Sequence, residues 1–125
     1  MLEKSPTLIV YKKQDIVFQS DGKWLYPLFS LEVFLQEHPI DMNSVCIHDK
    51  VVGKAAAMLI ARLQPKRVHG VIMSELAVNF LNQFGLPYSY DQLVERVQCK
   101  TESLLLDVDD INKAYDILCK RAGRC

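Results

Sequence analysis

Hydrophobic positions along the chain alternate between the spacing that is typical of strands and the spacing that is typical of helices. The β-rich runs Thr7–Lys12 and Asp15–Gln19 are close enough to form a hairpin. The apolar runs Ser44–His48 and Lys66–Met73 predict two buried strands, and a short strand is expected around residues 88–90. The pattern therefore predicts five strands.

Helical spacing occupies most of the chain between these strands. The expected helices are one capped by Ser30, one from about Asp49 to Gln64, one capped by Ser74 and ended by Gly85, a short one over Gln92–Val97, and a last one capped by Asp110. The second helix is apolar around most of its girth, which is typical of a helix covered on several sides.

The order of these elements predicts the fold class. A strand–helix–strand–helix centre implies parallel strands joined by right-handed crossovers, with the first hairpin antiparallel beside them. We expect an α/β fold, a three-layer sandwich with helices on both faces of the sheet. One domain should span residues 1–125, with its core over about 7–122.

Composition and charge exclude several classes of protein. The 125 residues carry 15 basic and 15 acidic side chains, which argues against nucleic-acid binding through a basic face. No apolar run reaches the roughly 18 residues that span a bilayer, and the first residues lack the core of a signal peptide. We therefore expect a cytoplasmic protein with no membrane or nucleic-acid partner.

The four cysteines and three histidines do not have the spacing of a zinc site. No Cys-x-x-Cys pair occurs, and reduced thiols are expected in the cytoplasm. The sequence thus predicts no metal and no other cofactor.

The strongest candidate site lies where the two central strands run into helices, because open α/β sheets bind ligands beyond the carboxyl ends of their strands. Asp49 is expected to cap the first helix, whose amides would face an anion. Lys50 and Lys54 would share one face of that helix. Gly53, inside the expected helix, indicates a close approach by another backbone or a ligand. The alternative is that the lysines are solvated and the glycine only permits tight packing.

Two further groups of residues could take part. Ser74 and Glu75 hold the equivalent place on the next helix, although capping explains both without a function. In a later loop, Cys99 could act as a nucleophile, and Glu102, like Asp49, as a base.

Several of these motifs together resemble a small prokaryotic family of unknown function. They are Asp49–Ala57, read Asp-Lys-Val-Val-Gly-Lys-Ala-Ala-Ala, the run Cys99–Glu102, Leu106–Asp110, Ala114–Tyr115 and Pro27–Leu28. The family belongs to the cytidine-deaminase-like superfamily, so the resemblance implies a mixed five-stranded sheet flanked by helices. The His-x-Glu and Pro-Cys-x-x-Cys zinc motifs of true deaminases are missing here, which excludes deamination by their mechanism.

Two functions follow from these observations. The first is a domain without zinc that binds a small anionic or nucleotide-like ligand at the N-termini of the two central helices and could also be catalytic. The alternative is a non-catalytic interaction or oligomerisation module, such as a homodimer, with a vestigial pocket.

Overall fold

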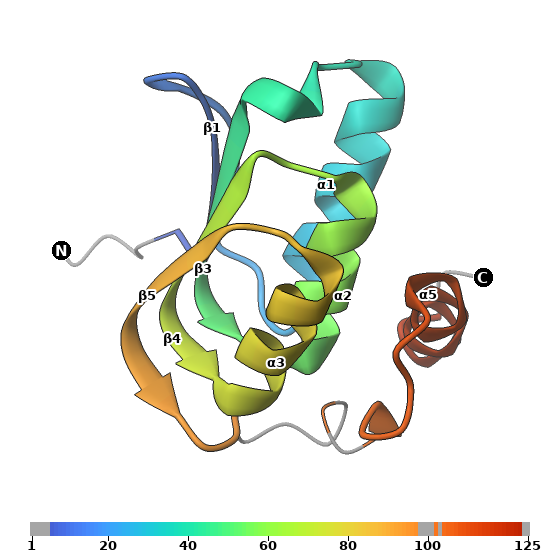
Figure 1. The fold of residues 1–125 in the computed structure, drawn as a ribbon. Coiled ribbons are helices and arrows are strands. Elements are labelled where there is room, and N and C mark those ends of the chain that lie inside the picture. The colour runs from blue at the N-terminus through green and yellow to red at the C-terminus, as the bar shows by residue number, and fades with distance from the viewer. Residues whose placement is uncertain (1–5, 98–101, 103, 124–125) are drawn as a thin grey trace, which may run out of the picture.

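The computed structural model describes residues 6–97, 102 and 104–123, and its core is one mixed five-stranded sheet (Figure 1). The strands lie in the order β2-β1-β3-β4-β5. Their bounds are Leu8–Lys12 for β1, Asp15–Ser20 for β2, Val45–Val52 for β3, Arg67–Ser74 for β4 and Tyr88–Val94 for β5. β1 is antiparallel to both β2 and β3, whereas β3, β4 and β5 are parallel. The expected hairpin and mixed sheet are confirmed.

Four longer helices accompany the sheet in the described part of the chain. They are α1 (Tyr26–Glu37), α2 (Lys54–Leu63), α3 (Glu75–Phe84) and α5 (Ile111–Arg121), and a 3₁₀ turn, η1 (Met42–Ser44), precedes β3. Ser74 caps α3 through its hydroxyl group, and Gly85 ends that helix with φ 90°. Asp110 caps α5. These three signals were predicted and are confirmed.

The helices α1, α2 and α3 all cover the same face of the sheet (Figure 1). The connections β2–α1–β3, β3–α2–β4 and β4–α3–β5 each join parallel strands and each move in one direction across the sheet. When successive right-handed crossovers all move in the same direction across a sheet, their helices all lie on the same face of that sheet. The prediction of helices on both faces is therefore not confirmed in the described part of the chain.

The last helix forms a second helical layer. α5 packs against α2, and Figure 1 shows it on the side of α2 away from the sheet. Consequently all residues from Lys54 to Ala61 are buried. The sheet on one side and α5 on the other explain why α2 is apolar around its girth.

One expected helix begins earlier than predicted, and another is a strand. α1 begins at Tyr26, with Pro27 in its first turn, so Ser30 lies inside the helix and does not cap it. The expected helix over Gln92–Val97 is wrong, because Gln92 and its two successors pair with β4 and extend β5 to Val94.

The boundary between β3 and α2 is the most important correction. Asp49 and Val51 still pair with β4, so the strand continues four residues beyond His48. Gly53 is the N-cap residue of α2, and the helix begins at Lys54. Asp49 consequently caps no helix, Lys50 shares no helix face with Lys54, and Gly53 lies outside the helix.

Two other expectations concern the environment of the protein. Among the described residues, no helix has the length and hydropathy that crossing a membrane requires. Cys46 is a free thiol, whereas Cys119 is disulfide-bonded. The expectation of reduced thiols is therefore wrong for Cys119.

Candidate functional site

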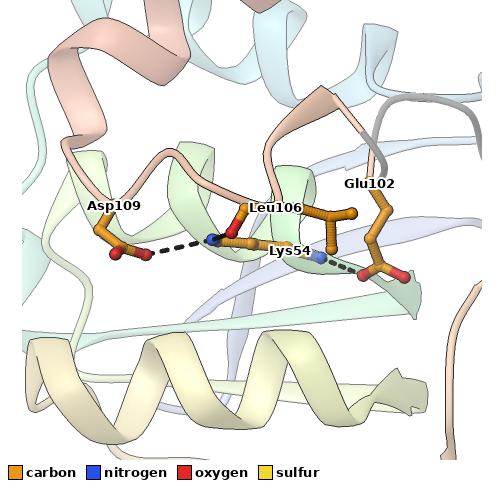
Figure 2. A network of polar contacts seen from close by, with 4 residues as sticks. All are labelled: Lys54, Glu102, Leu106 and Asp109. Atoms are coloured by element: carbon orange, nitrogen blue, oxygen red, sulfur yellow. Dashed lines mark hydrogen bonds and ion pairs between the residues drawn. The ribbon is translucent and has the colours of Figure 1, made fainter.

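A buried carboxylate lies at the start of α2, where the sequence predicted an anionic ligand. Glu102 is 1% exposed, and its Oε2 accepts a hydrogen bond from the backbone nitrogen of Lys54 at 2.6 Å (Figure 2). Its Oε1 accepts a bond from the backbone nitrogen of Val97 at 3.0 Å. A carboxylate at a helix N-terminus satisfies an otherwise unpaired amide and interacts favourably with the helix dipole.

The same carboxylate reaches the start of α3. Ser74 Oγ donates a hydrogen bond to Glu102 Oε2 at 2.6 Å and accepts one from the backbone nitrogen of Ala77 at 3.1 Å. Ser74 is fully buried. Glu102 thus joins the first turns of both central helices, and these bonds account for its burial without any reaction.

Gly53 is required by this arrangement. A Cβ atom at that position would lie 2.5 Å from Val97 Cγ2 and 2.9 Å from Glu102 Oε2. The close approach that the glycine indicated is therefore real, but the approaching groups are side chains of this chain.

Lys54 is directed away from the start of the helix and toward the segment before α5. Its Nζ lies 3.1 Å from Asp109 Oδ1 and donates to the Leu106 carbonyl oxygen at 3.3 Å (Figure 2). The lysine side chain is 6% exposed and that of Asp109 is 72% exposed. The buried charge of Lys54 is therefore balanced by partners within the chain and does not require a ligand.

A cavity of about 360 Å³ lies beside this network. It is bounded by the end of β3, the first turn of α2 and the segment that leads into α1. The lining residues are Thr7, Gly22, Lys23, Trp24, Leu25, Asp49, Lys50, Val51, Gly53, Ala55, Ala56, Val97 and Glu102. Its volume falls within the range of sites that bind small molecules.

Asp49 is the titratable group of this cavity with the most altered environment. Burial raises the pKa of its carboxyl group from 3.8 to about 7, while hydrogen bonds from the backbone amides of Lys50 and Val51 oppose the shift. A carboxyl group that titrates near neutral pH can both donate and accept a proton in that range.

The structure brings together half of the predicted site residues. Asp49, Lys50, Gly53 and Glu102 line the cavity, whereas Lys54, Ser74 and Glu75 do not. Ser74 and Lys54 are buried, and Glu75 is exposed on the first turn of α3.

The remaining predicted residue, Cys99, lies outside the described residues. Lys23 and Trp24 were missed by the sequence analysis. The signal available for them was a lone tryptophan beside a lysine, directly after the Asp21–Gly22 turn.

No three His, Cys, Asp or Glu side chains are grouped for metal binding within the described ranges. The absence of a zinc site remains a prediction for the whole chain, because Cys99 is not described.

Comparisons with known proteins identify relatives without a known activity. Residues 1–121 match a family model described as "TM1506: Domain of unknown function (DUF1893)". The crystal structure of a DUF1893 family protein (TM1506) from Thermotoga maritima is similar, with a TM-score of 0.81 and 27% identity. That match covers 93% of this chain and 80% of the Thermotoga chain. No match was found among curated proteins.

Proposed function

The chain belongs to the DUF1893 family, whose function is unknown, and we propose that it is a small-molecule-binding domain for an anionic, nucleotide-like ligand. The observation that carries the proposal is the cavity of about 360 Å³ lined by Lys23, Trp24, Asp49 and Lys50. It combines two cations, an aromatic ring and a titratable carboxyl group. Such a small set of polar groups in a mostly apolar hollow is typical of ligand sites.

The ligand is assigned to the cavity beside the first turn of α2, and not to the first backbone amides of the two central helices. Glu102 already accepts bonds from the first turn of α2 and from Ser74 at the start of α3. A second anion at the same amides would be repelled by that carboxylate. We therefore assign attraction of the anionic group to Lys23 and Lys50.

We also propose that the fold is cytidine-deaminase-like and that the domain works without zinc. The mixed five-stranded sheet, which that resemblance implied, supports the first part. Elemental analysis of protein purified without a metal-affinity tag tests the second, because stoichiometric zinc that resists chelators would overturn it.

The test of ligand binding uses a variant that fills the cavity. Val51 lines it and is 45% exposed, so Val51→Phe should occupy the space with little effect on the core. Val71 is 44% exposed on the neighbouring strand β4 and is not a lining residue, so Val71→Phe is the matched control. Both variants and the wild type are unfolded in the presence of inorganic phosphate, sugar phosphates and nucleotides.

A ligand that binds only the native state should raise the free energy of unfolding by about 2.7 kcal/mol at a hundredfold excess over its dissociation constant. We expect this gain for the wild type and Val71→Phe, and its loss in Val51→Phe. Lys50→Met should weaken it, whereas Lys66→Met, at an exposed position outside the cavity, should not. If no compound stabilises the wild type, the proposal fails and the interaction-module alternative is favoured.

A further inference from the structure

One aromatic residue of the cavity, Trp24, indicates the chemical class of the ligand. Resting on the proposed function, we infer that Trp24 is a stacking platform for a planar nitrogen heteroaromatic ring of nucleobase type, whose edge hydrogen-bonds to Asp49. Both residues line the cavity.

The backbone of Trp24 has an unusual conformation. Its φ is 56°, in the left-handed region that a bulky side chain rarely adopts. Residues held in such regions tend to cluster at functional sites, where the surrounding structure maintains them. The indole is nevertheless 36% exposed, so the strained backbone does not serve to bury the ring completely.

Contacts on both sides hold this residue in place. Thr7 Oγ1 donates to the carbonyl oxygen of Gly22 at 2.8 Å, and Leu25 is buried in the core. The Trp24 ring meets the Tyr26 ring edge-on, with centroids 5.1 Å apart. These contacts restrict the backbone around Trp24 and one edge of its ring before any ligand binds, which lowers the entropic cost of binding.

The chemistry around the indole selects a ring with polar edges. Stacking on an aromatic side chain tolerates every nucleobase, since each has a π-face. A carboxylate at Asp49 accepts a bond from a ring N–H group, and its protonated form donates one to a ring nitrogen. Lys23 and Lys50 suit a phosphate attached to the ring through a sugar.

Trp24 is the one tryptophan of the chain, so its fluorescence reports directly on this site. We would titrate the wild type with uracil, adenine, uridine 5′-monophosphate and adenosine 5′-monophosphate, and with ribose 5-phosphate as a compound without a ring base. We expect the ring compounds to quench the emission to saturation and ribose 5-phosphate to leave it unchanged. Val51→Phe should abolish the quenching, and Val71→Phe should retain it.

A second measurement tests whether the Trp24 ring contributes to binding or only lies near the bound compound. Binding of the same compounds to Trp24→Phe and Trp24→Leu would be followed by saturation-transfer NMR, with circular dichroism to confirm folding. Base stacking contributes about 1–3 kcal/mol, so Trp24→Leu should weaken the ring compounds at least fivefold. Trp24→Phe keeps a ring and should weaken them less, while ribose 5-phosphate should be unaffected by either change.

The outcomes distinguish this inference from the proposed function. If ring compounds and ribose 5-phosphate bind the wild type equally, and Trp24→Leu retains both, the stacking inference is wrong while ligand binding in the cavity stands. If neither kind of compound binds the wild type, both fail. Should Trp24→Leu not fold, the comparison of Trp24→Phe with the wild type decides.

Discussion

The Oε2 atom of Glu102 lies 2.6 Å from the backbone nitrogen of Lys54, across 48 residues of sequence. The first amide of α2 is therefore satisfied by a carboxylate from the other end of the chain. Because Ser74 Oγ donates to the same oxygen, one buried charge links the starts of two helices. The site beside it depends on this link, since Gly53 and Glu102 both line the cavity.

Removing the Glu102 carboxylate should strongly destabilise the fold. Glu102→Ala leaves the backbone amides of Lys54 and Val97 without their acceptor. We expect a loss of roughly 2–5 kcal/mol in the free energy of unfolding, measured by urea denaturation. Added formate should restore part of the loss by occupying the vacated carboxylate position.

Glu102→Gln tests whether the charge is required, because an amide nitrogen cannot accept the bonds that one of the two oxygens now accepts. Glu75→Gln, in the exposed first turn of α3, is the matched control and should change stability by less than about 0.5 kcal/mol. Equal, small effects of both variants would contradict a linking role for Glu102.

Lys54 should be a structural residue with no influence on ligand binding. Lys54→Met replaces a buried ammonium group by an apolar side chain of similar length, and the Asp109 carboxylate that loses its partner is 72% exposed to water, so the change should be nearly neutral. Asp109→Asn instead removes the negative charge next to that buried ammonium, whose other acceptor is the neutral Leu106 carbonyl oxygen, and should cost about 1–2 kcal/mol.

Thermal unfolding of both variants with and without the best ligand checks this prediction. The shift that the ligand produces should equal that of the wild type in each case. A Lys54→Met protein that folds normally but no longer responds to the ligand would place the lysine in the site after all.

Local signals explain what the sequence could predict. Ser74 and Gly85 bound α3 correctly, and Asp110 caps α5, because capping depends on side chains next to the helix end. The boundary between β3 and α2 was misplaced since residues 49–52 have helical spacing as well, and their pairing with β4 is a long-range contact.

The site itself depends on contacts that no local pattern contains. Gly53 signalled a close approach, but its neighbours Val97 and Glu102 lie more than forty residues away in the sequence. Trp24 lines the cavity next to a long-range contact, in which Thr7, in the segment before β1, donates a hydrogen bond to the Gly22 carbonyl oxygen. The sequence could therefore identify the region of the site. It could not identify all of the residues, because only half of the predicted site residues line the cavity.

His48 should make the protein less stable in acid. It lies beside His69 on the sheet, with ring centroids 5.2 Å apart, and its ring meets Tyr11 edge-on. Burial, and then the charges of His69 and Arg67, lower the pKa of His48, while Asp91 opposes them. The unfolded chain therefore binds this proton more readily, so the contribution is present above pH 6.5 and is lost as the pH falls.

His48→Phe keeps a ring against Tyr11 and removes the titration. Its free energy of unfolding should fall less than that of the wild type between pH 7 and pH 5, as measured by urea denaturation at each pH. His38→Phe, at the C-cap of α1, is the matched histidine variant. If both variants behave alike, the acid sensitivity does not come from His48.

Asp49 should have the opposite effect on stability. Burial raises the pKa of its carboxyl group from 3.8 to about 7, so between these values the unfolded chain releases a proton that the native state keeps. This group therefore lowers the free energy of unfolding as the pH rises from about 4 to 7 and adds no further change above that range. Asp49→Asn removes the titration while keeping the shape of the side chain.

The stability of Asp49→Asn relative to the wild type should consequently increase across that range, by roughly 1–4 kcal/mol in total. Urea denaturation at pH 4.5, 6, 7.5 and 8.5 measures this difference, and taking it against the wild type cancels the contribution of His48. Asp107→Asn, at an exposed position, is the matched control variant. A difference for Asp49→Asn that does not vary with pH would mean that the carboxyl group ionises as freely in the native state as in the unfolded chain. The Asp49 carboxyl group would then not titrate near neutral pH and could not exchange a proton with a ligand there. The predicted rise would instead show that the cavity keeps this carboxyl group partly protonated near neutral pH, at a cost in the free energy of unfolding.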